Sequence, residues 1–240
     1  MKKSEFVFNG KSSMDFFLTI EYLPGYATAK KQVETYTVPG RPGRLIFDTG
    51  DYENVSQTYE VWFKAPEKQD THTAARTIAN WLLGANGYRR LEDSYDPEVF
   101  RMAYFAGPAD FENILRKYGR AELEFTCLPQ RWVKAGQNAI DVEDGQEIYN
   151  EWQKSLPLLQ ISGSGSGTLQ IGEQTVAISA IPSGGITIDC DTQNAYSGTI
   201  NRNSLITVQN GFPELAHGSN LIEWTGGIQA VQITPRWWCV

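Results

Sequence analysis

The sequence predicts a mainly β protein, with an N-terminal β-sandwich-like domain that holds one α-helix and a β-hairpin arm, followed by a C-terminal β-sandwich. Short β-prone runs bounded by glycine and proline recur along the chain. Residues 70–84 are the one stretch with convincing helical spacing of apolar residues. After residue 157 no helical period remains, and short strand-like runs follow one another between glycines, which is typical of a sandwich.

The composition is that of a globular protein of one large or two modest domains. The 240 residues are 41% hydrophobic, 12% aromatic and 20% charged. No run reaches the length of a membrane span, and the N-terminus lacks the unbroken apolar segment of a signal peptide, so we expect a protein kept in the cytosol. Cys127, Cys190 and Cys239 are far apart and odd in number, and we expect buried thiols rather than disulfides or a zinc site.

Charge divides the chain into two different surfaces. Residues 1–135 hold 18 Lys and Arg and 18 Asp and Glu, whereas residues 136–240 hold 3 and 10, so the net charge of −7 lies in the C-terminal part. No basic patch with interleaved aromatic residues is present, which argues against tight nucleic-acid binding. An acidic surface repels a polyanion and suits a wall that nucleic acid passes without binding.

The first half begins with strand-like runs at 6–8 and 13–22, and residues 30–37 are expected to be the incoming strand of a hairpin arm. Residues 45–47 are β-prone, and Thr49-Gly50-Asp51 is predicted to end that run. From Thr58 to Lys64, apolar and polar residues alternate, which predicts a half-buried strand.

The tip of the arm is defined by two Pro-Gly pairs, which force a sharp bend. An isolated hairpin is marginally stable, so the arm either folds back on its own domain or reaches a neighbouring copy of the chain. For the second alternative, the candidate subunit contacts are the seven residues of the tip: Val38, Pro39, Gly40, Arg41, Pro42, Gly43 and Arg44.

The predicted helix is capped by Asp70 or Thr71 and stops at Gly84. Strands are expected at 88–91 and 99–105, a loop with a helical turn at 110–118, and an alternating strand at 121–127 that ends at Pro129. These elements complete a first domain of residues 1–135.

Residues 136–156 are rich in acidic side chains and predict an exposed junction, which leaves residues 157–240 as the second domain. The residues from Ser162 to Gly167 alternate serine and glycine and are predicted to form a hairpin turn. The expected strands of this domain are 158–162, 168–171, 175–178, 185–189, 205–208, 220–224 and 228–233, with 148–150 as a possible addition in the junction.

No motif predicts catalysis, a cofactor or a metal. Gly10-Lys11-Ser12 has no first glycine and no preceding strand, so it is no phosphate loop. Asp189 and Asp191 miss the calcium-loop pattern and are interpreted as turn carboxylates. His72 and His217 have no catalytic neighbours in the sequence, and Trp224 is expected in the core. We therefore expect no enzyme.

Short motifs in a fixed order carry a resemblance to a known family. Val38-Pro39-Gly40-Arg41-x-Gly43-x-Leu45 followed by Tyr52-Glu53-Asn54 is the most telling. Together with the others, it resembles the distal tail proteins of long, flexible-tailed bacteriophages, the Dit family. The other motifs are Phe6-x-Phe8-Asn9-Gly10, Ser13-x-Asp15-Phe16, Phe125-x-Cys127-x-Pro129, Ile148-x-Asn150, Pro157-Leu158-Leu159, Ile161-x-Gly163, Ile188-Asp189-x-Asp191, Asn201-x-Asn203, Phe212-Pro213-x-Leu215, Gly218-x-Asn220 and Ile233-x-Pro235-Arg236-Trp237.

The resemblance implies a structural virion protein of the distal tail tip, assembled in the host cytoplasm. It implies that the N-terminal domain builds a homohexameric ring, a baseplate hub with a channel for DNA, and that a galectin-like β-sandwich decorates the outside. It also implies several partners: the tail-tube protein, the tail-associated lysin or fibre protein, and receptor-binding proteins of the host-adsorption apparatus. No membrane partner is implied, and DNA is expected only in passage.

The alternative interpretation is a carbohydrate-binding, lectin-like module. Its stacking platform would come from Trp152, Trp224, Trp237 or Trp238. A cell-wall hydrolase is a third interpretation, but the sequence identifies no paired acid and base for it.

Overall fold

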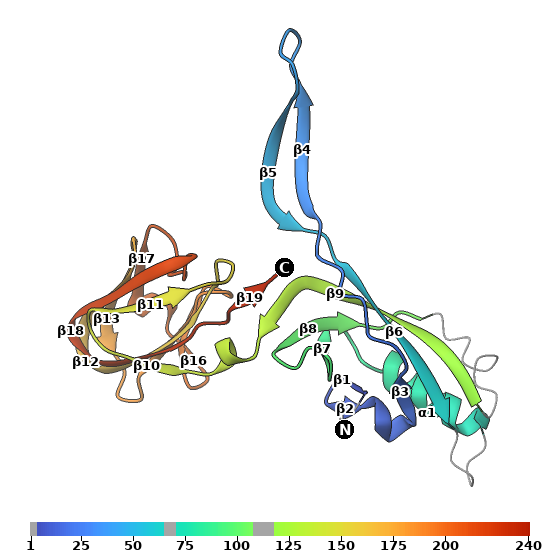
Figure 1. The fold of residues 1–240 in the computed structure, drawn as a ribbon. Helices are drawn as coiled ribbons and strands as arrows, with labels where there is room; N and C mark the ends of the chain where they lie inside the picture. The colour runs from blue at the N-terminus through green and yellow to red at the C-terminus, as the bar shows by residue number, and fades with distance from the viewer. Residues whose placement is uncertain (1–3, 65–70, 108–117) are drawn as a thin grey trace. The chain divides into compact units, whose positions relative to one another are not determined.

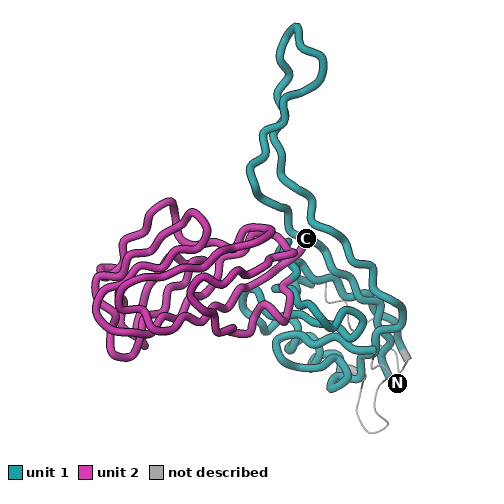
Figure 2. Tube along the Cα trace, turned by 60° about the vertical axis from the view of Figure 1, so that its left-hand side comes forward, with its two compact units in different colours: residues 1–131, 240 teal, residues 132–239 magenta. Residues whose placement is uncertain are grey.

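The computed structural model describes residues 4–64, 71–107 and 118–240 (Figure 1). The chain forms two units, residues 1–131 with residue 240, and residues 132–239 (Figure 2). The division therefore falls at residue 131, and the segment expected as an acidic junction, 136–156, belongs to the second unit.

The first unit is built on one antiparallel sheet and one helix in its described part. The helix α1 spans Thr71–Leu83, and a short 3-10 helix spans Ser13–Phe16. A separate two-stranded sheet is formed by β4 (Lys31–Thr37) and β5 (Arg44–Tyr52). The main sheet has the order β2 (Lys11–Ser12), β1 (Phe6–Phe8), β7 (Arg89–Asp93), β8 (Val99–Tyr104), β9 (Tyr118–Val133), β6 (Val55–Lys64) and β3 (Leu18–Ile20).

The core of the first unit lies between the helix and the sheet and is largely aromatic. Phe6 stacks on Tyr59 and on Trp81, with ring centroids 5.1 and 5.7 Å apart. Trp81 also donates its indole N–H to the Phe8 carbonyl oxygen at 3.2 Å, so the helix is fixed to β1 by packing and by a hydrogen bond. Burying one such ring contributes roughly 1.5–3 kcal/mol. Of the apolar residues at helical spacing in this stretch, Ala74, Ala75, Ile78 and Leu82 are buried, and Ala79 is partly buried.

Two predicted strand ends in the first unit are wrong. The strand β5 continues through Gly50 to Tyr52, because Gly50 takes a φ of +80° and its N–H bonds the Asp48 carboxylate, so the strand bends without ending. The strand β9 continues past Pro129 to Val133. Its ladder with β6 ends at the pair Val55–Cys127, so Pro129, which has no N–H, lies beyond it.

Some predictions cannot be compared with the structure. The cap residue Asp70 and the predicted loop at 110–117 lie outside the described residues, and so does the side chain of His72.

The predicted alternation along β6 is confirmed, since Tyr59, Val61 and Phe63 are buried while Glu60 and Lys64 are exposed.

The second unit is a β-sandwich in which two long strands belong to both layers. In one layer the order is β10, β18, β12, β14, β15, β16, and in the other β11, β18, β12, β13, β17. The strands of the layers are β10 (Ile140–Val142), β11 (Gln146–Asn150), β12 (Leu158–Ile171), β13 (Gln174–Ile181), β14 (Ile186–Asp189), β15 (Asn194–Ser197), β16 (Ile200–Asn201), β17 (Ile206–Gln209) and β18 (Gly218–Thr234). The short strand β19 (Trp238–Cys239) lies outside both layers, and 3-10 turns span Ala135–Gln137 and Asn203–Leu205.

The serine-glycine run was predicted to be a hairpin turn, and this prediction is wrong. The run is instead the place where the continuous strand β12 bends. Residues 158–161 pair with β14 and with 231–234 of β18, whereas 167–171 pair with β13 and with 222–226 of β18. A Cβ on Gly227 would lie 1.6 Å from the Ser164 carbonyl oxygen, and one on Gly167 would lie 2.6 Å from the Ile228 side chain. Glycine is therefore required here because the two backbones cross closely, where strands pass from one layer to the other.

The acidic junction was mispredicted because its charges were counted without their alternation. In β10 and β11, Val142 and Ile148 are buried, while Asp141 and Glu147 lie on the outer face. Both strands pair with β18, so this segment is an integral part of the second sheet.

Two of the three cysteines are buried thiols, as expected, and Cys239 is half-buried, contrary to expectation. Burial raises the pKa of the Cys127 thiol to about 11 and that of Cys190 to about 12, so both stay protonated at neutral pH. In the described part of the chain, no helix has the length and apolar character needed to span a bilayer.

Candidate subunit interface

The predicted contact residues, 38–44, lie together at the tip of the arm (Figure 1). Arg41 donates its N–H to the Val38 carbonyl oxygen at 3.2 Å, which closes a β-turn with Pro39 and Gly40 at its centre. Gly40 has a φ of +81° and Gly43 one of +85°. Proline followed by glycine at positive φ is the signature of a type II turn, so the sequence itself fixes the geometry of the tip.

The two strands of the arm pair only with each other among the described strands, and the arm extends away from the main sheet of its own unit (Figures 1 and 2). All residues of β4 and all of β5 except Tyr52 are exposed. A hairpin of this kind is at best marginally stable in water. The arm therefore lacks a packing surface within the described chain.

Apolar side chains occupy both faces of the arm. Residues directly opposite in the register share a face, so Tyr36 and Leu45 lie on one face and Ile46, opposite Thr35, on the other. Phe47 lies on the first face and is 68% exposed, and Ile46 is 69% exposed. Exposed apolar residues gathered on one element mark an interaction site. An arm that is apolar on both sides fits between two surfaces better than against one.

The tip is positively charged. Lower on the arm, Lys31 pairs with Asp48, and Lys30 lies 3.6 Å from Glu53. Arg41 and Arg44 have no ion-pair partner in the described part of the chain. Their two positive charges are thus available to another molecule.

The root of the arm, residues 21–30, has no regular secondary structure but is anchored at three points. Tyr26 donates its hydroxyl to Asp93 at 2.8 Å, Gln57 donates its side-chain N–H to the Gly25 carbonyl oxygen at 3.1 Å, and Arg101 donates to the Ala27 carbonyl oxygen at 3.3 Å. These contacts fix where the arm leaves the sheet.

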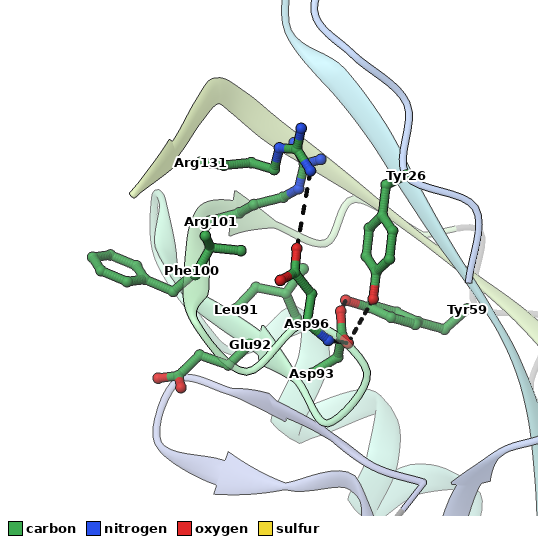
Figure 3. Close-up of a pocket in the computed structure, with 10 residues that line it drawn as sticks. Tyr26, Tyr59, Leu91, Glu92, Asp93, Asp96, Phe100, Arg101 and Arg131 are labelled. Atoms are coloured by element: carbon green, nitrogen blue, oxygen red, sulfur yellow. Dashed lines mark hydrogen bonds and ion pairs between the residues drawn. The ribbon is translucent and has the colours of Figure 1, made fainter. Parts of the chain in front are cut away.

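Asp93 is the centre of this anchor (Figure 3). Its carboxylate also accepts the hydroxyl of Tyr59 at 3.0 Å and the backbone N–H groups of Tyr95 and Asp96 at 2.8 and 3.0 Å. Burial and the adjacent Asp93 raise the pKa values of Tyr26 and Tyr59 above the ordinary tyrosine range, so both hydroxyls stay protonated and able to donate.

The cavity at this anchor is too small for a ligand. Its volume is about 10 Å³, which is room for about one water molecule. The charged residues around it, Arg101, Arg131 and Asp96, are drawn into the same cluster, with Arg131 and Asp96 3.9 Å apart. The cluster therefore has the features of a structural support for the arm.

Of the four tryptophans considered for sugar stacking, Trp224 is partly buried. Trp224 lies opposite Leu169, which is fully buried, and packs against the core of the sandwich, as expected. The D-x-D pair also has a structural role, because Asp189 accepts two hydrogen bonds from Arg236, at 2.6 and 3.1 Å, and caps the N–H of Asp191. Among the described residues, no group of three or more His, Cys, Asp or Glu could hold a metal ion.

Sequence reasoning identified the tip but missed the anchor and the two apolar faces. The faces could have been found from Leu45, Ile46 and Phe47, because three consecutive apolar residues of a strand point to alternate sides of it. Asp93 gave no such signal, because its partners at positions 26 and 59 come together only in the fold.

Comparisons with known proteins agree with this architecture. The family described as phage tail protein RIFT-related domain matches residues 6–127. The structure is similar to that of the Dit protein of phage SPP1, whose description calls it a paradigm of the hub adsorption apparatus in phages that infect Gram-positive bacteria. The TM-score is 0.76 at 12% identity, over 95% of this chain and 97% of that one.

A weaker similarity extends to chains of the phage P2 baseplate in its activated conformation. In the structure with Ca the TM-score is 0.52 at 9% identity, over 97% of this chain and 98% of that one. In the structure with Sr it is 0.50 at 10% identity, over 95% and 97%. No curated protein sequence matches the chain significantly.

Proposed function

Because this chain belongs to the family of phage tail proteins with a RIFT-related domain, we propose that it is a structural protein of the distal tail of a bacteriophage. In this proposal, six copies close into a ring through the first unit, and the ring forms a hub that leaves a channel for DNA. The resemblance of the fold to a phage hub protein over nearly the whole chain supports this assignment.

One observation carries the proposal of self-assembly: the arm exposes both of its faces and finds no surface to pack on within its own described chain. A ring needs heterologous contacts, in which one patch of a subunit meets a different patch on the next. A projecting hairpin with apolar sides and a fixed tip is suited to be one of those two patches. We therefore propose residues 38–44 as subunit contacts.

The hub would join the tail-tube protein on one side to the tail-associated lysin or fibre protein on the other. The second unit, as a galectin-like sandwich on the outside of the ring, would be the place where receptor-binding proteins attach. Joining two other tail proteins and leaving a channel for DNA requires no catalysis, so we propose no enzymatic activity. The protein would be assembled in the host cytoplasm and then reside in the virion.

The solution mass of the purified chain tests the ring. Light scattering after gel filtration is expected to give about 161 kDa for six copies of 26.9 kDa, and negative-stain electron microscopy is expected to show particles with a central hole. A chain that remains at 26.9 kDa at every concentration, and binds glycans as a monomer, would instead favour the lectin-like alternative.

Valine in place of both tip glycines tests the role of the arm. Gly40→Val with Gly43→Val is expected to abolish the ring, because both positions have positive φ that valine adopts only with strain, and to leave a folded monomer. Gly198→Val is the matched control, since Gly198 has a φ of +60° and open space around it but lies in the second unit. A normal ring from the double variant would refute the role of the tip.

A further inference from the structure

The outward face of the β6–β9 ladder carries an unusual juxtaposition of like charges. Glu60 of β6 lies directly opposite Glu122 of β9, and Glu124, opposite Thr58, follows two ladder pairs along on the same face. All three carboxylates are exposed. Like charges directly opposite each other on a sheet destabilise it, so this arrangement costs the isolated subunit stability.

The cations near these carboxylates do not compensate them. Arg120, on the same face, is paired with Glu21, the residue that follows β3. Lys64 lies at the end of β6, four ladder pairs beyond Glu60 on the same face. Glu60, Glu122 and Glu124 have no ion-pair partner in the described ranges. We call these three residues, together with Trp62, the acidic face.

The tip of the arm has the complementary chemistry. It presents Arg41 and Arg44 at the end of a hairpin whose sides are apolar. The acidic face likewise combines charge with an aromatic side chain, because Trp62, directly opposite Arg120 in the ladder, lies on this face and is 38% exposed. Guanidinium groups bind carboxylates by charge-assisted hydrogen bonds, so the carboxylates of this face suit an arginine-bearing tip.

The tip cannot come from the same chain. The strand β5 passes into β6 through Tyr52 and Val55, and both views show the arm running away from the main sheet (Figures 1 and 2). To reach Glu60 of its own chain, the hairpin would have to reverse at the root that Asp93, Gln57 and Arg101 hold in place. A second copy has no such restriction.

We propose that the arm tip of one copy docks on the acidic face of the next copy. This inference rests on the proposed function and adds the missing half of the ring contact: the tip is one patch and the acidic face is the other. Each copy offers one tip and one face, and a contact of that kind repeats from subunit to subunit until the ring closes.

A charge exchange tests the pairing. Arg41→Glu with Arg44→Glu, and separately Glu60→Lys with Glu122→Lys, are each expected to shift the chain from ring to monomer mass. The chain that carries all four substitutions is expected to regain the ring, because tip and face are again complementary. The control is Glu151→Lys with Glu173→Lys, two exposed carboxylates of the second unit, which is expected to assemble normally.

Each outcome decides the inference. Normal rings from the chain with Glu60→Lys and Glu122→Lys would overturn the inference. The acidic face would then be exposed to solvent or line the channel of the ring. Failure of the fourfold variant to assemble, with a circular dichroism spectrum and melting temperature like those of the unaltered chain, would overturn it as well. These results differ from failure of the proposed function, in which the unaltered chain itself remains a monomer.

Discussion

At the scale of the residue, Asp93 shows how a single carboxylate can support an element that lies far from it. It accepts hydrogen bonds from Tyr26, Tyr59, Tyr95 and Asp96, and so joins the root of the arm, the main sheet and the turn after β7. Tyr59 is only 2% exposed, so its hydroxyl depends on this partner. The direction in which the arm leaves the sheet follows from these bonds.

Replacing this carboxylate gives a direct test. Asp93→Ala is expected to lower the free energy of unfolding by about 2 kcal/mol or more, because it leaves the buried Tyr59 hydroxyl without a partner. It should also speed hydrogen exchange in residues 22–30. Denaturant melts and exchange mass spectrometry measure both effects, with the exposed Asp191→Ala as control. Unchanged exchange at the root would show that Asp93 does not hold the arm.

Asp189 and Arg236 make the second unit sensitive to acid. Burial alone would raise the pKa of Asp189, but the hydrogen bonds and charge of Arg236, together with the backbone N–H groups of Asp191 and Thr192, outweigh it and the pKa is lowered overall. A carboxyl group with a lowered pKa adds stability above its unfolded value, about 3.9, and loses it as the pH falls through its folded value. The ion pair should therefore weaken below about pH 4.

The comparison of Asp189→Asn with the unaltered chain measures this contribution. The difference in melting temperature is expected to be largest near neutral pH and to shrink below about pH 4, as the carboxyl group of Asp189 becomes protonated and, like the amide of Asn, carries no charge. Asp191→Asn, a neighbour with no salt bridge in the described chain, is expected to show no such dependence. A difference that persists unchanged in acid would exclude the ion pair as its cause.

At the scale of the element, the arm and the bent strands show two uses of glycine. In the arm, Gly40 supplies a positive φ in open space. In the sandwich, Gly227 is needed for the opposite reason, because another backbone lies against it. The first is a requirement of the turn alone, and the second is a requirement of the tertiary structure.

An added methyl group separates the two requirements. Gly227→Ala is expected to destabilise the second unit by about 3 kcal/mol or more, since its Cβ would meet the Ser164 carbonyl oxygen and backbone must move. Gly184→Ala is the control, because its Cβ would meet only the Ser197 hydroxyl at 3.8 Å. Equal melting temperatures for the two variants would mean that the strands separate easily at the crossing.

At the scale of the whole molecule, the sequence predicts the elements better than their connections. The mainly β class and the helix follow from local periodicity, and both are confirmed. The serine-glycine bend and the strand at 140–142 were mispredicted, because pairing with the distant β18 decides them, whereas the possible strand at 148–150 is present as part of β11. The run of β9 past Pro129 was also mispredicted, and it lies beyond the ladder with β6. Of the candidate interface, the tip is local and was predicted, whereas the acidic face exists only once Glu60 meets Glu122 across the sheet.

The sharing of β12 and β18 between both layers has a consequence for how the second unit unfolds. Neither layer keeps its two central strands if the other separates, since residues 158–161 and 167–171 are one continuous strand. A half-melted sandwich would expose apolar residues of both layers at once. Unfolding of the second unit should therefore be all-or-none. Refolding requires β12 and β18, about sixty residues apart in the sequence, to find each other, so this sandwich should fold slowly but cooperatively.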